Sequence, residues 1–175
     1  MLTLFCGLVI GWERGVASAA PAETFPVEYW DGSLAEIKDK QSVALVIIRS
    51  SVLDATGNDE PIIREALTAE PRLAPRHRFA YSLIARKLNQ YIRKYRSLRP
   101  ADQTSRADFI LYFKLIEYRR MLNGVYPYGE LFVILNSKPE TTGSARIIWR
   151  TNKIVFAEDA IKALLRDLKQ VRGEQ

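Results

Sequence analysis

The stretch DFILYFKLIEY, residues Asp108–Tyr118, carries the strongest β-strand signal in the chain. Apolar side chains occupy both of its alternating faces, since successive side chains of a strand point to opposite sides. One face carries Phe109, Leu111, Phe113 and Leu115, and the other carries Ile110, Tyr112 and Ile116. This alternation predicts a β-strand, and the elements on either side of it are considered next to it.

The segment that follows predicts further strands and then a helix. Asn123-Gly124 is the dipeptide preferred in a two-residue type I′ hairpin. Acidic residues suit a helix N-terminus, so Glu158-Asp159 is expected to begin the last helix. Its apolar stripe consists of Ile161, Leu164, Leu165, Leu168 and Val171. The strands between are expected over Glu130–Leu135 and Ala145–Arg150, separated by a turn over Ser137–Ser144 and continuing into Ile154–Phe156.

The segment before the strand predicts one more strand and two helices. Ser42–Arg49 is a short β-branched apolar run, typical of a central strand buried on both faces. Pro61 is expected to open a short helix through Leu67, because proline is favoured at the first helical position. From about Arg78 to Leu98 the apolar residues recur with helical spacing. The predicted fold is therefore an α+β two-layer sandwich, β-α-β-β-β-α, with a mostly antiparallel sheet and helices packed on one face.

The N-terminal region has the form of an export signal. Leu2–Trp12 is apolar and has the length of a signal-peptide core, and Ala17-Ser18-Ala19 has the A-x-A form of a cleavage site. We therefore expect a signal peptide over residues 1–19, an extended lead-in over 20–41 and a single domain over 42–172, located in the periplasm or secreted. The alternative is a buried N-terminal strand or helix, because no Lys or Arg precedes the apolar run. Cys6 does not stand in a lipobox sequence.

The chemical inventory contains few groups for catalysis. The sequence has one Cys, Cys6, and one His, His77, which stands between two arginines. A structural zinc site normally needs several such ligands, and no phosphate-binding glycine loop or nucleophile-elbow motif occurs. We expect no metal, no cofactor and no enzymatic activity. One catalytic alternative stays open, a carboxylate-dependent cell-wall glycan hydrolase, in which Glu117 and Glu130 face each other across the hairpin and Asp108, which opens a strand, is a further candidate acid.

Positive charge is concentrated in about one fifth of the chain. Residues 71–106 carry ten Lys or Arg against one acid, Asp102, a formal +9 within a chain whose net charge is +6. A basic helix of this kind suits an anionic partner, so the expected partner is an envelope protein or an anionic envelope surface, with peripheral membrane association at most. The candidate binding residues are Arg86, Lys87, Arg93, Lys94 and Arg96, together with Tyr126 and Tyr128 beyond the predicted turn. A cytoplasmic nucleic-acid-binding domain is the alternative that the same charge allows.

The C-terminal half loosely resembles small bacterial periplasmic lipoprotein domains of the curli-secretion (CsgG-like) and TolB amino-terminal type. The resemblance covers roughly residues 80–170 and consists of an Ala-Asp pair before an apolar strand, a Gly-led strand, and Thr-Gly before a strand that ends in Trp. These are Ala107-Asp108 with Phe109–Leu111, Gly129–Val133, and Thr142-Gly143 with Ile147–Arg150. The resemblance implies a periplasmic adaptor or assembly role without enzymatic activity.

Overall fold

A computed structural model describes residues 27–28, 32–49, 59–71, 80–136, 145–151 and 153–174. Within them a mixed sheet is built in the order β1-β6-β5-β4-β2-β3, and β7 pairs with β5. β2 runs parallel to β4 and to β3, and the remaining pairs are antiparallel. The strands are β1 (Val27–Glu28), β2 (Ser42–Arg49), β3 (Arg99–Pro100), β4 (Phe109–Met121), β5 (Gly124–Leu135), β6 (Arg146–Thr151) and β7 (Val155–Phe156).

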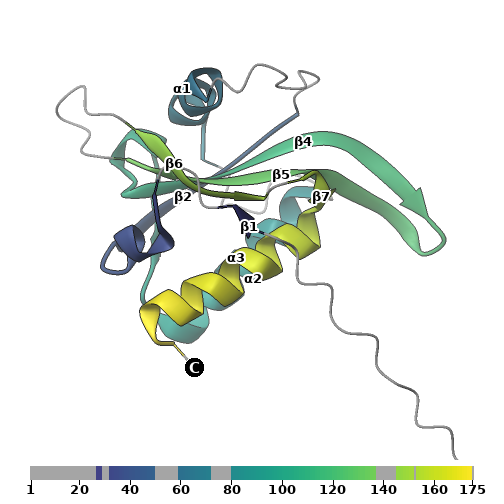
Figure 1. Cartoon of the computed structure of the whole chain (residues 1–175). Coiled ribbons are helices and arrows are strands. Elements are labelled where there is room, and N and C mark those ends of the chain that lie inside the picture. Colours follow the sequence, from purple (N-terminus) through teal and green to yellow (C-terminus); the bar gives the residue numbers. More distant parts are fainter. Residues whose placement is uncertain are drawn as a thin grey trace, which may run out of the picture.

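Three α-helices pack on this sheet, so the predicted α+β class is confirmed. α2 (Ala80–Tyr95) and α3 (Ala157–Arg172) share a hydrophobic core with one face of the sheet. The short helix α1 (Glu60–Thr68) lies on the other face, where Ile62 and Ala66 belong to a second, smaller core. The sequence predicted all three helices, but the expectation that the helices pack on one face is wrong for α1, which lies opposite the two longer ones (Figure 1).

β4 and its parallel neighbour β2 occupy the positions that their sequences predict. β2 has the predicted bounds, and its residues 43–47 are buried. In β4 the side chains of Phe109, Phe113 and Tyr112 have no exposed surface, the first two facing α2 and α3 and the third facing the side of α1. Apolar residues on both faces of these strands thus match helices on both faces of the sheet.

The β4–β5 hairpin forms a long arm that projects beyond the helices (Figure 1). Met121 pairs with Gly124, so the loop residues are Leu122 and Asn123. The predicted type I′ turn is wrong, because that turn needs a positive φ at both central residues. Among the described non-glycine residues only Arg96 has one, whereas Gly124 has φ 145°. β5 also begins at Gly124 and not at Glu130, which places Tyr126 and Tyr128 within the strand.

The expected extended lead-in contains a folded element. η1 (Leu34–Ile37) is a 3-10 helix whose first residues are held by a capping box between Ser33 and Glu36. Leu34 and Ile37 are fully buried in the core beneath α2 and α3. The packed domain therefore begins before residue 42. A second 3-10 helix, η2 (Thr104–Arg106), precedes β4.

Several sequence expectations fall outside the described residues. These are the export signal with Cys6, the segment around His77 and the turn over Ser137–Ser144.

Candidate anion-binding face

A groove of about 330 Å³ runs between α2 and α3 on the outer side of the domain. Five of the residues that line it are cationic, and no carboxylate is among its lining residues in the described part of the chain. The cations are Lys87 and Lys94 of α2, and Lys162, Arg166 and Lys169 of α3. We call this set the basic groove.

The basic groove contains two of the five basic residues predicted as binding residues, Lys87 and Lys94. Arg86, Arg93 and Arg96 are exposed but do not line it. Arg96 follows α2 directly and adopts φ 55°, while its backbone N–H donates to the Ile92 carbonyl at 2.8 Å. The helix thus ends in a left-handed residue, a position that glycine usually fills.

The three cations of α3 were missed in the sequence. They stand at spacings of four and three residues, which place Lys162, Arg166 and Lys169 on one side of a helix. That spacing was a usable signal, but neighbouring acidic residues balance the charge of this segment. The groove emerges only when α3 packs beside α2.

Two cations of the basic groove have acidic partners. Lys162 pairs with Glu158 at 2.9 Å, and this contact lowers the pKa of Glu158 and raises that of Lys162. Arg166 lies 2.9 Å from the Asp167 carboxylate. Across the described residues, no carboxylate lies within 4.0 Å of Lys87, Lys94 or Lys169. Three ammonium groups of the groove therefore remain without a neutralising ion pair.

Tyr95 lies between two of these ammonium groups. The Nζ atoms of Lys94 and Lys169 are 4.7 and 5.5 Å from the centre of its ring. The interaction with Lys94 lowers the pKa of the Tyr95 phenol; burial opposes that shift and Lys169 reinforces it. The hydroxyl oxygen is covered, yet it makes no well-aligned hydrogen bond with any described residue.

The neighbouring Tyr91 is held differently. Its ring lies 4.9 Å from the Tyr95 ring at an interplanar angle of 47°. Its hydroxyl donates to the Glu174 carboxylate. Burial, and then Glu174, raise the pKa of Tyr91 well above the ordinary value. Of the two tyrosines, only Tyr91 thus has its hydroxyl bonded to a carboxylate of the described residues.

The other two predicted site residues, Tyr126 and Tyr128, lie on β5 within the hairpin arm. Tyr126 and Tyr128 make edge-on contacts with Phe156, at 6.2 and 5.2 Å between ring centres, and the Arg119 guanidinium lies 3.6 Å from the centre of the Tyr128 ring. Both tyrosines are half-buried by these contacts. The structure therefore does not bring them into the basic groove.

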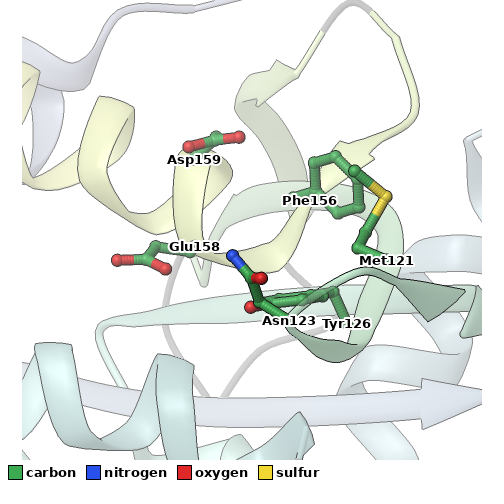
Figure 2. Close-up of a pocket in the computed structure, with 6 residues that line it drawn as sticks. All are labelled: Met121, Asn123, Tyr126, Phe156, Glu158 and Asp159. Atoms are coloured by element: carbon green, nitrogen blue, oxygen red, sulfur yellow. The ribbon is translucent and has the colours of Figure 1, made fainter. Parts of the chain in front are cut away.

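Tyr126 also borders a small cavity of about 220 Å³ beneath the arm. Figure 2 shows its wall of Met121, Asn123, Tyr126 and Phe156, with Glu158 and Asp159 at the start of α3. The Glu158 carboxylate points away from the centre of the cavity (Figure 2), in agreement with its pairing to Lys162. Burial raises the pKa of Asp159. This cavity has no cationic lining among the described residues and is separate from the basic groove.

The three carboxylates considered for glycan hydrolysis do not converge. Glu117 is opposite Tyr128 and Glu130 is opposite Lys114, so the expected pairing of Glu117 with Glu130 is wrong. Asp108 lies nine residues before Glu117 on an extended strand, a separation of roughly 30 Å. Glu117 binds Arg119 at 2.6 Å, and Asp108 accepts hydrogen bonds from backbone N–H groups. These three side chains therefore form no acid/base pair.

No cluster of three or more His, Cys, Asp or Glu side chains among the described residues is arranged to hold a metal ion. None of the helices described is long and apolar enough to cross a lipid bilayer.

No protein-family model matches the chain, and no curated relative matches it. A solved structure, the dodecamer of a PelC point variant from Paraburkholderia phytofirmans, is similar over 86% of this chain and 98% of its own, with 16% sequence identity and a TM-score of 0.37. A likeness this distant carries no argument about function.

Proposed function

We propose that this chain is a non-enzymatic, exported domain that binds another, anionic component of the bacterial cell envelope through the basic groove. The observation that carries the proposal is the groove itself: five cations from two helices line it, and three of them have no carboxylate within 4.0 Å among the described residues. Charge of one sign gathered in a concave surface attracts oppositely charged ligands and speeds their association.

The arrangement of the two helices supports a binding role beyond that of a solvated helix face. Surface lysines usually gain little from isolated ion pairs, but here Lys94 and Lys169 lie beside the same tyrosine ring. Their mutual repulsion is relieved when an anion binds between them. The signal-like N-terminus and the resemblance to periplasmic lipoprotein domains support the envelope location.

The experiment uses the full chain and two variants with the same change in net charge. In the first variant Arg86, Lys87, Arg93 and Lys94 are replaced by Glu. In the control the replaced cations are Lys38, Arg99, Arg106 and Arg120, all exposed and outside the groove. The probes are vesicles of phosphatidylcholine with and without phosphatidylglycerol, poly-glutamate, and a double-stranded DNA oligonucleotide.

We expect the wild type and the control to bind the anionic vesicles or poly-glutamate, with an affinity that falls as salt rises, and the α2 variant to bind neither. Equal binding by the two variants contradicts the proposal. Preference for DNA, together with a chain that keeps Met1 in the cytosol, replaces it with the nucleic-acid alternative. Mass spectrometry of the N-terminus after cell fractionation tests export directly, since cleavage after Ala19 is the expected result.

A further inference from the structure

One position in the basic groove has more than diffuse positive charge. Lys94 and Lys169 come from different helices, and both lie beside the Tyr95 ring. The Tyr95 hydroxyl is covered by neighbouring atoms and makes no well-aligned hydrogen bond. A covered polar group without a partner loses its bonds to water and gains none in return, so its presence calls for an explanation.

We infer that Lys94, Lys169 and the Tyr95 hydroxyl form a binding site for a phosphomonoester group. This inference rests on the proposed function and names the ligand chemistry of its groove. The two ammonium groups match the charge of a phosphomonoester, which is close to a dianion at neutral pH and presents three strong acceptor oxygens. The phenol supplies the third donor.

The charges around this position favour a dianion over a carboxylate. Lys94 and Lys169 have no carboxylate within 4.0 Å among the described residues. No ion pair there neutralises either positive charge. A carboxylate neutralises only one of them. The carboxylate of Glu174 accepts a hydrogen bond from the Tyr91 hydroxyl.

The groove has room for the remainder of such a ligand. Its volume of about 330 Å³ exceeds that of a single phosphate group. Lys87 stands seven residues before Lys94, a distance of roughly 10 Å along a helix. Tyr91 and Leu165 also line the groove. The geometry suits a phosphomonoester whose body lies along the groove toward Lys87 and Lys162.

The test measures binding of inorganic phosphate and of acetate to the full chain by calorimetry at matched ionic strength. We expect phosphate to bind and acetate to bind at least tenfold more weakly. Tyr95→Phe removes a hydroxyl that has no well-aligned protein partner, so the fold is retained, and it should weaken phosphate binding by about tenfold or more. Lys94→Gln should do the same, whereas Arg99→Gln, an exposed cation outside the groove, should change binding less than about twofold.

Vesicles distinguish the possible sources of the phosphoryl group. Phosphatidic acid carries a phosphomonoester and phosphatidylglycerol carries a diester. A preference for phosphatidic acid that disappears in Tyr95→Phe identifies a lipid headgroup, and binding of free phosphate with no such preference identifies a soluble phosphomonoester. Either result supports the site.

Two results would overturn the inference. One is equal binding of phosphate and acetate, and the other is phosphate binding unchanged in both Tyr95→Phe and Lys94→Gln. If poly-glutamate binding is nevertheless lost in the α2 charge-reversal variant, the proposed function stands without the phosphoryl site. If the wild-type protein binds none of these anions, the result contradicts both the proposed function and the phosphomonoester site.

Discussion

Asp108 and Ser42 are joined by two hydrogen bonds at the point where the parallel strands β2 and β4 begin. The Asp108 carboxylate accepts from the Ser42 backbone N–H at 2.8 Å, and the Asp108 N–H donates to the Ser42 carbonyl at 2.9 Å. The same carboxylate accepts from the Gln41 N–H at 3.0 Å. An acidic side chain that the sequence offered as a catalytic candidate thus aligns the central strand pair.

We predict that Asp108→Ala lowers the free energy of unfolding by about 1–3 kcal/mol, because it leaves two backbone donors without an acceptor. Asp108→Asn should cost less, since one side-chain oxygen still accepts. Equilibrium denaturation measures both. Glu117→Ala is the control on the same strand, and as an exposed site it should change stability by less than about 0.5 kcal/mol. An Asp108→Ala protein as stable as the wild type would show that these bonds contribute nothing.

Gly129 is required by the close approach of β4. A Cβ atom added at this position would lie 2.0 Å from the backbone carbonyl oxygen of Lys114, an atom that cannot move without disturbing the sheet. Gly129→Ala should therefore destabilise the protein by about 3 kcal/mol or more. Gly173 has open space around it and a φ of 66°, so Gly173→Ala should cost only about 1 kcal/mol. Thermal unfolding of the two variants gives the comparison, and equal costs would contradict the steric explanation.

Arg172, at the end of α3, links η1 to the helices through hydrogen bonds to backbone carbonyls. Its guanidinium donates to the carbonyls of Ile37 at 2.7 Å, of Lys40, and of Ser97 at 3.4 Å. A lysine has no planar set of donors for three such acceptors. We predict that Arg172→Lys lowers stability by about 1–2 kcal/mol and increases hydrogen exchange at the amides of Lys38 and Lys40. Exchange at these amides that stays as slow as in the wild type would contradict this role.

The two adjacent tyrosines of α2 should titrate far apart. The pKa of Tyr95 is lowered by Lys94, and that of Tyr91 is raised by burial and by Glu174. On raising the pH, the Tyr95 phenol should ionise before Tyr91. Lys94→Gln should move the Tyr95 pKa upward, because removing a nearby cation destabilises the phenolate. NMR of ring-labelled tyrosine resolves the two groups, and a titration of Tyr95 that does not respond to Lys94→Gln would show that the ammonium group acts too weakly.

The sequence predicted those features that depend on local pattern. The alternation of apolar side chains located β2 and β4, and helical spacing located α2 and α3. The type I′ turn failed because the preferred Asn-Gly dipeptide is shifted by one residue from the loop that forms. The 3-10 helix η1 was hidden in a segment rich in proline and charge, where two buried residues, Leu34 and Ile37, are too few to produce a periodic signal.

The site was only partly predictable, because it is made by two helices far apart in the chain. Charge segregation identified Lys87 and Lys94. Lys169 joins them in one groove only because α3 packs beside α2, and the sequence pattern does not show that packing. Nor could the pattern show that Tyr95 keeps a hydroxyl without a well-aligned partner. Pairings across the sheet were equally inaccessible, which is why Glu117 and Glu130 were wrongly placed face to face.

The central claim, that the face made jointly by α2 and α3 binds an anionic component, is tested most directly by two single charge reversals. The measurement is the apparent Kd of the full chain for phosphatidylglycerol-containing vesicles in the wild type, Lys94→Glu and Lys169→Glu. Because the two ammonium groups flank one tyrosine ring, both variants should weaken binding by a similar factor, about tenfold each, and binding should fall with added salt. Binding that weakens in neither variant, or in Lys94→Glu alone, would contradict a shared site.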